Sequence, residues 1–108
     1  VLPSYLYRQQ AEHARLILDM AEDQGIDCLE AQSAALANRL DTSKILRQAN
    51  SPALIIGGLH DTLCPVAEQQ KMQRLVPQGK LKILENSGHF SVLEQADEVN
   101  EALLAWLN

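Results

Sequence analysis

The residues with the clearest chemical potential are Asp61 and His89, which stand in two separate short loops. Each loop follows a short predicted strand, at 53–58 and at 81–85. A carboxylate beside an imidazole can fix the ring's tautomer and stabilise its charged form, so that the other ring nitrogen acts as a general base. Asp61 and His89 therefore form a candidate acid–base pair, provided that the fold brings their loops together.

The elements around these loops predict a parallel sheet. Residues 53–58, Ala-Leu-Ile-Ile-Gly-Gly, form a continuous apolar run that is typical of a strand covered on both faces. A helix is expected over 66–76 with Pro65 at its first position, then a strand over 81–85 and a last helix over 93–107. Strand, helix, strand, helix with short connections indicates a right-handed parallel unit, so the predicted fold class is α/β. Both loops then leave the carboxyl edge of the sheet, where open parallel sheets place their chemistry.

The first fifty residues predict helices. Residues 10–21 carry apolar side chains at spacings of three and four, at Ala11, Ala14, Leu18 and Ala21, and Gly25 predicts the end of that helix. A second helix is expected over about 29–40. A short third helix follows Asp41-Thr42-Ser43, whose side chains offer capping oxygens, and ends before Pro52.

Composition and charge exclude several classes of function. The chain has 108 residues, enough for one domain or a part of one, and its net charge of −5 argues against a nucleic-acid or anionic membrane surface. Apolar runs are only a few residues long, so we expect no transmembrane helix, and without a signal-peptide layout we expect a cytoplasmic protein. Cys28 and Cys64 are then expected as free thiols, although the sequence also permits one bridge between them.

Two other interpretations of the loops stay open on spacing alone. Asp61 could cap the helix after Pro65, with His89 an ordinary turn residue. His60, Asp61 and Cys64 could ligate a metal, but they lack the paired spacing of a zinc site, so we expect no metal and no cofactor.

The ordered pattern of the second half is distinctive. An apolar strand leads into Gly58-Leu59-His60-Asp61, and Pro65 follows four residues after the aspartate. After a helix and a strand come the turn Ser87-Gly88-His89-Phe90 and the last helix. In this order and spacing, residues 52–108 resemble the C-terminal end of the α/β-hydrolase superfamily, and 91–95 is similar to the stretch after the histidine in small bacterial esterase-like members. Those members commonly have proline where this chain has Ala96, a mild change in the first turn of a helix.

The resemblance implies a fold and two roles. It implies a C-terminal fragment of an α/β-hydrolase fold, with 1–50 as a helical cap-like segment and 51–108 as the C-terminal part of the core. It also nominates Asp61 as the acid and His89 as the histidine of a catalytic triad.

The family's nucleophile has no counterpart in this sequence. It usually stands in a Gly-x-Ser-x-Gly elbow, a pattern that the chain lacks, and Ser87 lies in the histidine turn itself. We therefore expect the C-terminal portion of a serine-type hydrolase of esters, lactones or amides, inactive alone, with substrate and nucleophile left open. The alternative is a non-catalytic stand-alone fragment that acts as an interaction or scaffold piece.

The predicted first strand implies a partner. In the family, the corresponding strand also pairs with an earlier strand, so Leu54, Ile55 and Ile56 would form an open apolar edge that invites pairing with another chain. The chain opens on Val1 instead of Met, so we expect it to be a processed, truncated or excised piece of a longer protein. We accordingly expect self-association or docking on the missing portion, and an ester-like small-molecule substrate only with that portion.

Overall fold

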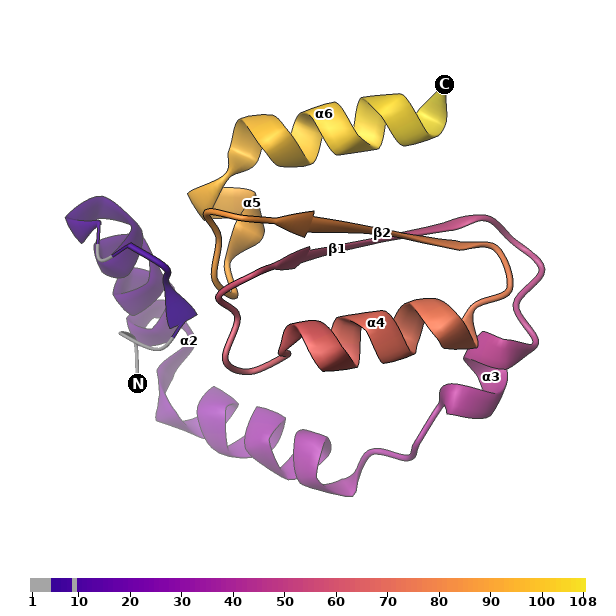
Figure 1. Ribbon diagram of the computed structural model, residues 1–108. Helices are drawn as coiled ribbons and strands as arrows, with labels where there is room; N and C mark the ends of the chain where they lie inside the picture. The colour runs from indigo at the N-terminus through magenta and orange to yellow at the C-terminus, as the bar shows by residue number, and fades with distance from the viewer. Residues whose placement is uncertain (1–4, 9) are drawn as a thin grey trace.

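The computed structural model describes residues 5–8 and 10–108 (Figure 1). In chain order its elements are α2 (Ala11–Asn38), α3 (Ser43–Arg47), β1 (Ala53–Gly58), α4 (Val66–Leu75), β2 (Gly79–Leu84), α5 (Ser91–Glu94) and α6 (Ala96–Leu107).

Strands β1 and β2 form a two-stranded parallel sheet, with Ala53 opposite Gly79 and Gly58 opposite Leu84. Figure 1 shows α4 and α6 on opposite sides of this sheet. The predicted α/β unit is thus confirmed. Because the strands are parallel and in register, the loops that follow them leave the same edge.

The boundaries of three elements differ from the predictions. Strand β2 begins at Gly79, two residues before the expected start. Pro65 is the residue before α4, with extended backbone angles (φ −60°, ψ 162°), and not the first helical residue. The prediction of one helix over 93–107 is wrong, because Gln95 (φ −139°, ψ 55°) separates α5 from α6. Its side-chain amide donates to the carbonyl oxygen of Asn86 at 3.1 Å, which ties this break to the loop after β2.

The helical first half contains one sharp break. Helix α2 is interrupted at Gly25, whose φ of 80° lies in the left-handed region that glycine tolerates best. The predicted helix end at Gly25 is therefore confirmed, but the chain resumes helical structure directly afterwards instead of at about residue 29. The short third helix is confirmed as α3, and the Asp41 carboxylate accepts hydrogen bonds from the backbone and hydroxyl of Ser43 at 2.9 and 2.6 Å.

The apolar core is thin. Its buried apolar residues are Leu6, Ile17, Val76, Leu84 and Val99. On α2 the buried residue is Ile17, whereas Leu18 of the predicted stripe is 42% exposed. On α6, Leu107 is 71% exposed. The radius of gyration is 15.5 Å, above the value of about 13 Å for a compact chain of this length, so α2 and α6 keep apolar surface that the described residues leave uncovered.

Strand β1 has a second edge that no strand of the described residues occupies. The amides of Ala53 and Leu59 donate towards β2, to Gln78 and Leu84, and backbone groups alternate along a parallel strand. The amides of Leu54 and Ile56 therefore face the other edge. A cleft of about 360 Å³ is lined by Leu54, Ile55, Ile56 and Gly57 and by side chains of the loops described below.

Two further observations bear on the sequence predictions. Cys28 and Cys64 are both free, which confirms the prediction of unpaired thiols. Within the described part of the chain, no helix combines the length and the apolarity needed to cross a bilayer.

Candidate active site

Two loops meet at the carboxyl edge of the sheet, residues 59–65 after β1 and 85–90 after β2. The amide of His60 donates to the carbonyl oxygen of Ser87 at 3.0 Å, which joins the loops directly. A Cβ added to Gly58 would lie 2.7 Å from the carbonyl carbon of Ser87 and closer still to the carbonyl oxygens of Ser87 and Gly88. The loops thus pack backbone against backbone, an approach that the missing side chain of Gly58 permits.

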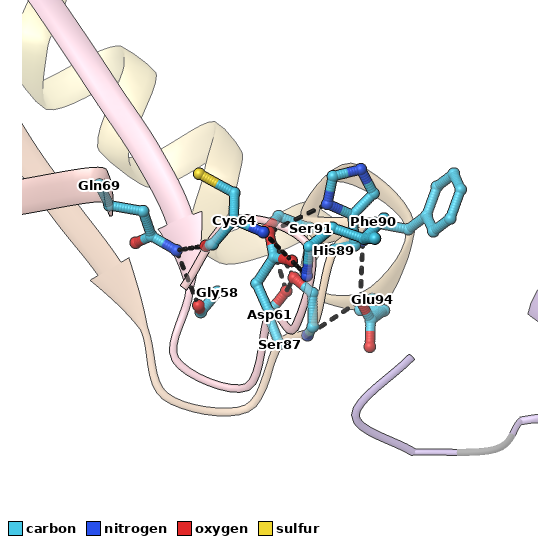
Figure 2. A network of polar contacts seen from close by, with 11 residues as sticks. Gly58, Asp61, Cys64, Gln69, Ser87, His89, Phe90, Ser91 and Glu94 are labelled. Atoms are coloured by element: carbon cyan, nitrogen blue, oxygen red, sulfur yellow. Dashed lines mark hydrogen bonds and ion pairs between the residues drawn. The ribbon is translucent and has the colours of Figure 1, made fainter. Parts of the chain in front are cut away.

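This packing brings together the two residues singled out in the sequence. Nδ1 of His89 lies 3.0 Å from Oδ2 of Asp61 (Figure 2). The other carboxylate oxygen of Asp61 accepts hydrogen bonds from the amides of Leu63 and Cys64, both at 2.9 Å. Asp61 therefore closes its own loop with Oδ1 while Oδ2 faces the imidazole. Helix α4 itself has no side-chain cap, so the helix-capping interpretation of Asp61 is wrong.

The pair has a buried acid and a more accessible imidazole. The side chain of Asp61 is 7% exposed and that of His89 is 39% exposed. Burial favours a higher pKa for Asp61, but hydrogen bonds from the Cys64 amide, the His89 imidazole and the Leu63 amide together hold its pKa below the ordinary 3.8. The carboxylate is therefore ionised at neutral pH. Nε2 of His89 makes no hydrogen bond to any described residue, so this nitrogen is available for proton transfer.

A thiol lies beside the pair. Cys64 lines the same cleft as Asp61 and His89. Burial, followed by the nearby carboxylates of Asp61 and Glu68, raises the pKa of the Cys64 thiol. The thiol is consequently protonated at neutral pH, and its raised pKa argues against a nucleophilic role.

The turn that carries His89 is held by residues far away in the sequence. The amide of His89 donates to the carbonyl oxygen of Tyr5 at 2.7 Å, and a Cβ on Gly88 would lie 2.6 Å from that same oxygen. Among the described glycines only Gly25 has a positive φ. Gly88 was expected to permit a sharp turn before His89, but it has no positive φ; its missing side chain lets the segment around Tyr5 approach the turn.

Glu94 is a second anchor of this turn. Its carboxylate accepts a hydrogen bond from the amide of Phe90 at 3.1 Å (Figure 2). It also accepts from the amides of Gly88 at 3.0 Å and Tyr7 at 2.7 Å. No role was predicted for Glu94, which is the last residue of α5. Gly88 and Phe90 lie close to it in the sequence, whereas Tyr7 lies 87 positions away and leaves no mark on the local sequence.

No role was predicted from the sequence for Gln69 either. This residue of α4 is only 2% exposed, and its side-chain amide donates to the carbonyl oxygens of Gly58 at 3.0 Å and Cys64 at 2.8 Å. It thereby braces the start and the middle of the loop that carries Asp61. Its own Oε1 is buried without a hydrogen-bond partner among the described residues. Glutamine on a helix is ordinarily exposed, so the sequence offered no signal for this role.

The other candidate residues have structural positions. Ser87 is fully buried, and its hydroxyl lies 3.0 Å from that of Ser91, so it is not placed to attack a substrate. The ring of His60 stacks on Tyr7, with centroids 3.9 Å apart. Within the described residues, no group of three or more His, Cys, Asp or Glu side chains is arranged to hold a metal ion.

Comparisons with known proteins find similarity to an acetyltransferase and to an esterase. No protein-family model matches it. Homoserine O-acetyltransferase of Salinibacter ruber is 32% identical over 69 residues, which cover 63% of this chain and 20% of that protein. Pimeloyl-[acyl-carrier protein] methyl ester esterase of Xanthomonas oryzae pv. oryzae is 35% identical over 72 residues, 67% of this chain and 28% of that protein. The chain thus spans less than a third of the length of these curated relatives.

This chain is also similar to solved structures of known proteins. An α/β-hydrolase enzyme, MGS-M2, from a Medee basin deep-sea metagenome is 30% identical over 62% of this chain and 24% of its own, with a TM-score of 0.59. This chain belongs to the α/β-hydrolase superfamily. An esterase of Exiguobacterium antarcticum matches 96% of the chain and 39% of its own with a TM-score of 0.79, and at 20% identity it shows that the α/β-hydrolase fold extends over the helical first half. The resemblance to this family is confirmed, while the roles of Asp61 and His89 stay predictions.

Proposed function

We propose that this chain supplies the acid and the histidine of an α/β-hydrolase that works by nucleophilic acyl transfer. The observation that carries the proposal is the 3.0 Å contact between Nδ1 of His89 and Oδ2 of Asp61 at the carboxyl edge of a parallel sheet. An ionised, buried carboxylate beside a more exposed imidazole is the arrangement that general-base catalysis by histidine requires.

The proposed chemistry assigns one step to each side chain. Asp61 accepts the hydrogen bond from Nδ1–H and so keeps Nε2 unprotonated and able to accept a proton. Nε2 removes the proton of a nucleophile as the nucleophile attacks the acyl carbon, and the resulting imidazolium is stabilised by the charge of Asp61. His89 then returns the proton to the leaving group, which restores the neutral ring.

The proposed substrate class is an ester, a lactone or an amide. The names of the two curated relatives describe transfer of an acetyl group to an oxygen and hydrolysis of a methyl ester. Both concern an acyl group bound to oxygen, which supports an ester-like substrate. The Gly-x-Ser-x-Gly elbow is absent from these 108 residues, so the nucleophile is proposed to come from a polypeptide segment outside them.

The free edge of β1 is the proposed contact with that segment. The amides of Leu54 and Ile56 face away from β2, and the cleft beside them extends to Asp61 and His89. An added strand would satisfy these amides and lie beside the acid–base pair.

The test uses the longest polypeptide that contains residues 1–108, assayed on a panel of p-nitrophenyl esters. We expect Asp61→Asn to lower kcat by about 10³–10⁴-fold and His89→Ala by at least as much. His13→Ala is the matched control, since it removes the same kind of side chain from α2 instead of from the two loops, and we expect it to keep activity within about threefold. Activity that survives His89→Ala would contradict the proposal.

The intact mass of the purified protein, with a search for a co-purifying polypeptide, complements this assay. A longer chain or a partner with a Gly-x-Ser-x-Gly elbow supports the catalytic proposal. A single 12.0 kDa species that binds no such partner favours the non-catalytic alternative.

A further inference from the structure

Glu94 makes three hydrogen bonds, all to backbone amides. Oε2 accepts from Gly88 at 3.0 Å and from Phe90 at 3.1 Å, the residues on either side of His89. Oε1 accepts from Tyr7 at 2.7 Å, across 87 positions of sequence. No Lys or Arg of the described residues forms an ion pair with this carboxylate, so its charge is balanced by these amide dipoles.

Three consecutive amides of the histidine turn are thereby fixed. The amides of Gly88 and Phe90 point at Glu94, and the amide of His89 between them donates to the carbonyl oxygen of Tyr5 at 2.7 Å. With the backbone held on both sides, the Cα–Cβ direction of His89 is set. That direction decides whether Nδ1 reaches Asp61, which is held in place by the amides of its own loop.

The segment at residues 5–8 reaches both loops. The ring of Tyr5 lies 6.0 Å from those of His89 and Phe90, and the ring of Tyr7 stacks on His60 of the other loop. Glu94 is the only side chain of the described residues that bonds both this segment and the histidine turn.

We propose that Glu94 is the positioning residue of His89. Its carboxylate holds the turn that aims the imidazole at Asp61, and it makes that aim depend on the segment around Tyr7. This inference rests on the proposed acid–base function of Asp61 and His89 and adds a residue to it.

The chemistry of glutamine makes a specific variant informative. Glu94→Gln keeps the size of the side chain but replaces one acceptor oxygen by an NH₂ group, which cannot accept from an amide. At least one of the three hydrogen bonds must then be lost. Glu94→Asp keeps the charge but is one methylene shorter, so it cannot span Tyr7 and the turn at the same time.

The tautomer of His89 is the readout, because lowered stability alone does not change it in the folded population. Uniformly ¹⁵N-labelled histidine in the 108-residue chain distinguishes Nδ1–H from Nε2–H, and His13→Gln and His60→Gln variants assign the signals. In the unaltered chain with a neutral imidazole, we expect the Nδ1–H form, which donates its hydrogen bond to Asp61. In Glu94→Gln we expect the Nε2–H fraction to rise about fivefold, with a smaller rise in Glu94→Asp. Glu101→Gln, an exposed glutamate on α6, removes the same charge and should change nothing.

The outcomes separate the two proposals. An unaltered chain without the Nδ1–H form would refute the acid–base pair itself. The role of Glu94 would be overturned if the unaltered chain has that form and Glu94→Gln and Glu94→Asp show the same tautomer of His89. The acid–base pair would then still stand. If Glu94→Gln does not fold, Glu94→Asp alone decides, because it retains the charge and two of the possible contacts.

Discussion

The contact between the loops that carry Asp61 and His89 depends on Gly58, so the substitution Gly58→Ala tests the proposed basis of the site. Its Cβ would lie 2.7 Å from the carbonyl carbon of Ser87, against about 3.5–4.0 Å for an unstrained contact. The nearest atoms are backbone, which cannot rotate away like a flexible side chain. The loop after β2 must therefore retreat by roughly 1 Å, which breaks or stretches the 3.0 Å hydrogen bond from His60 to Ser87.

The expected loss of stability in Gly58→Ala follows from these two effects. Overpacking strain contributes about 1–3 kcal/mol, and loss of the hydrogen bond from the His60 amide contributes about 0.5–1.5 kcal/mol more. Removing a glycine from the unfolded chain returns about 0.4–1 kcal/mol. We expect the free energy of unfolding to fall by about 0.5–4 kcal/mol, and the His89–Asp61 contact to be lost in the molecules that stay folded.

The matched control is Gly79→Ala in the same sheet. Its Cβ would meet its nearest neighbours at 3.2 Å, a contact that a shift of a few tenths of an ångström relieves. We expect a change within about 1 kcal/mol. Urea unfolding midpoints measure both variants, and ¹⁵N-histidine spectra report the pair. Equal midpoints for the two variants, together with an intact Nδ1–H signal in Gly58→Ala, would refute the argument that close loop packing sets the site.

Three further predictions concern charge, core and assembly. The pKa of Asp61 lies below 3.8 in the folded chain, so the stability contributed by its carboxylate is complete above the unfolded pKa of about 4 and is lost as pH falls through the folded pKa. The difference in urea midpoint between the unaltered chain and Asp61→Asn should therefore be constant at pH 5–7 and shrink below pH 4. A difference that stays constant down to pH 2 would contradict this. Leu84 is fully buried at the end of β2, so Leu84→Ala should cost about 2–5 kcal/mol in chemical denaturation, and a loss under 1 kcal/mol would show that this core is not continuous. The isolated chain should self-associate through the free edge of β1, and Ile55→Lys should reduce its mass in light scattering; a stable monomer before the substitution refutes self-association.

The sequence predicted the sheet well because the signals for strands are local. The run at 53–58 is apolar throughout, and β1 has those same bounds. Strand β2 begins with Gly79 and Lys80, a turn former and an exposed lysine, so only pairing with β1 reveals that they are strand residues. In the same way, the hydrogen bond from Gln95 to Asn86 breaks the last helix, and it joins two segments that periodicity treats as separate.

In the candidate site, the residues that the sequence could predict differ clearly from those that it could not. Asp61 and His89 were found because their residue types and their places after the strands carry chemical meaning. Glu94 and Gln69 were not found, because each acts on backbone atoms of other segments and such partners leave no mark on spacing. Ile17 and Leu18 show the same limit on α2: periodicity indicated a stripe through Leu18, but contacts in space bury its neighbour.

Asp61 and His89 are held in place by contacts that do not involve the free edge of β1 or the exposed apolar faces of α2 and α6. Asp61 is held by amides of its own loop and by the brace from Gln69, and His89 by Glu94 and Tyr5. All of these residues stand within the chain, and none of these contacts uses the free edge of β1, although that edge lines the same cleft as the pair. Preorganisation of the pair and completion of the sheet are therefore separable. A segment that carries the nucleophile and docks along β1 would find Asp61 and His89 already in contact. Its binding would then only have to bring the nucleophile within reach of Nε2 of His89.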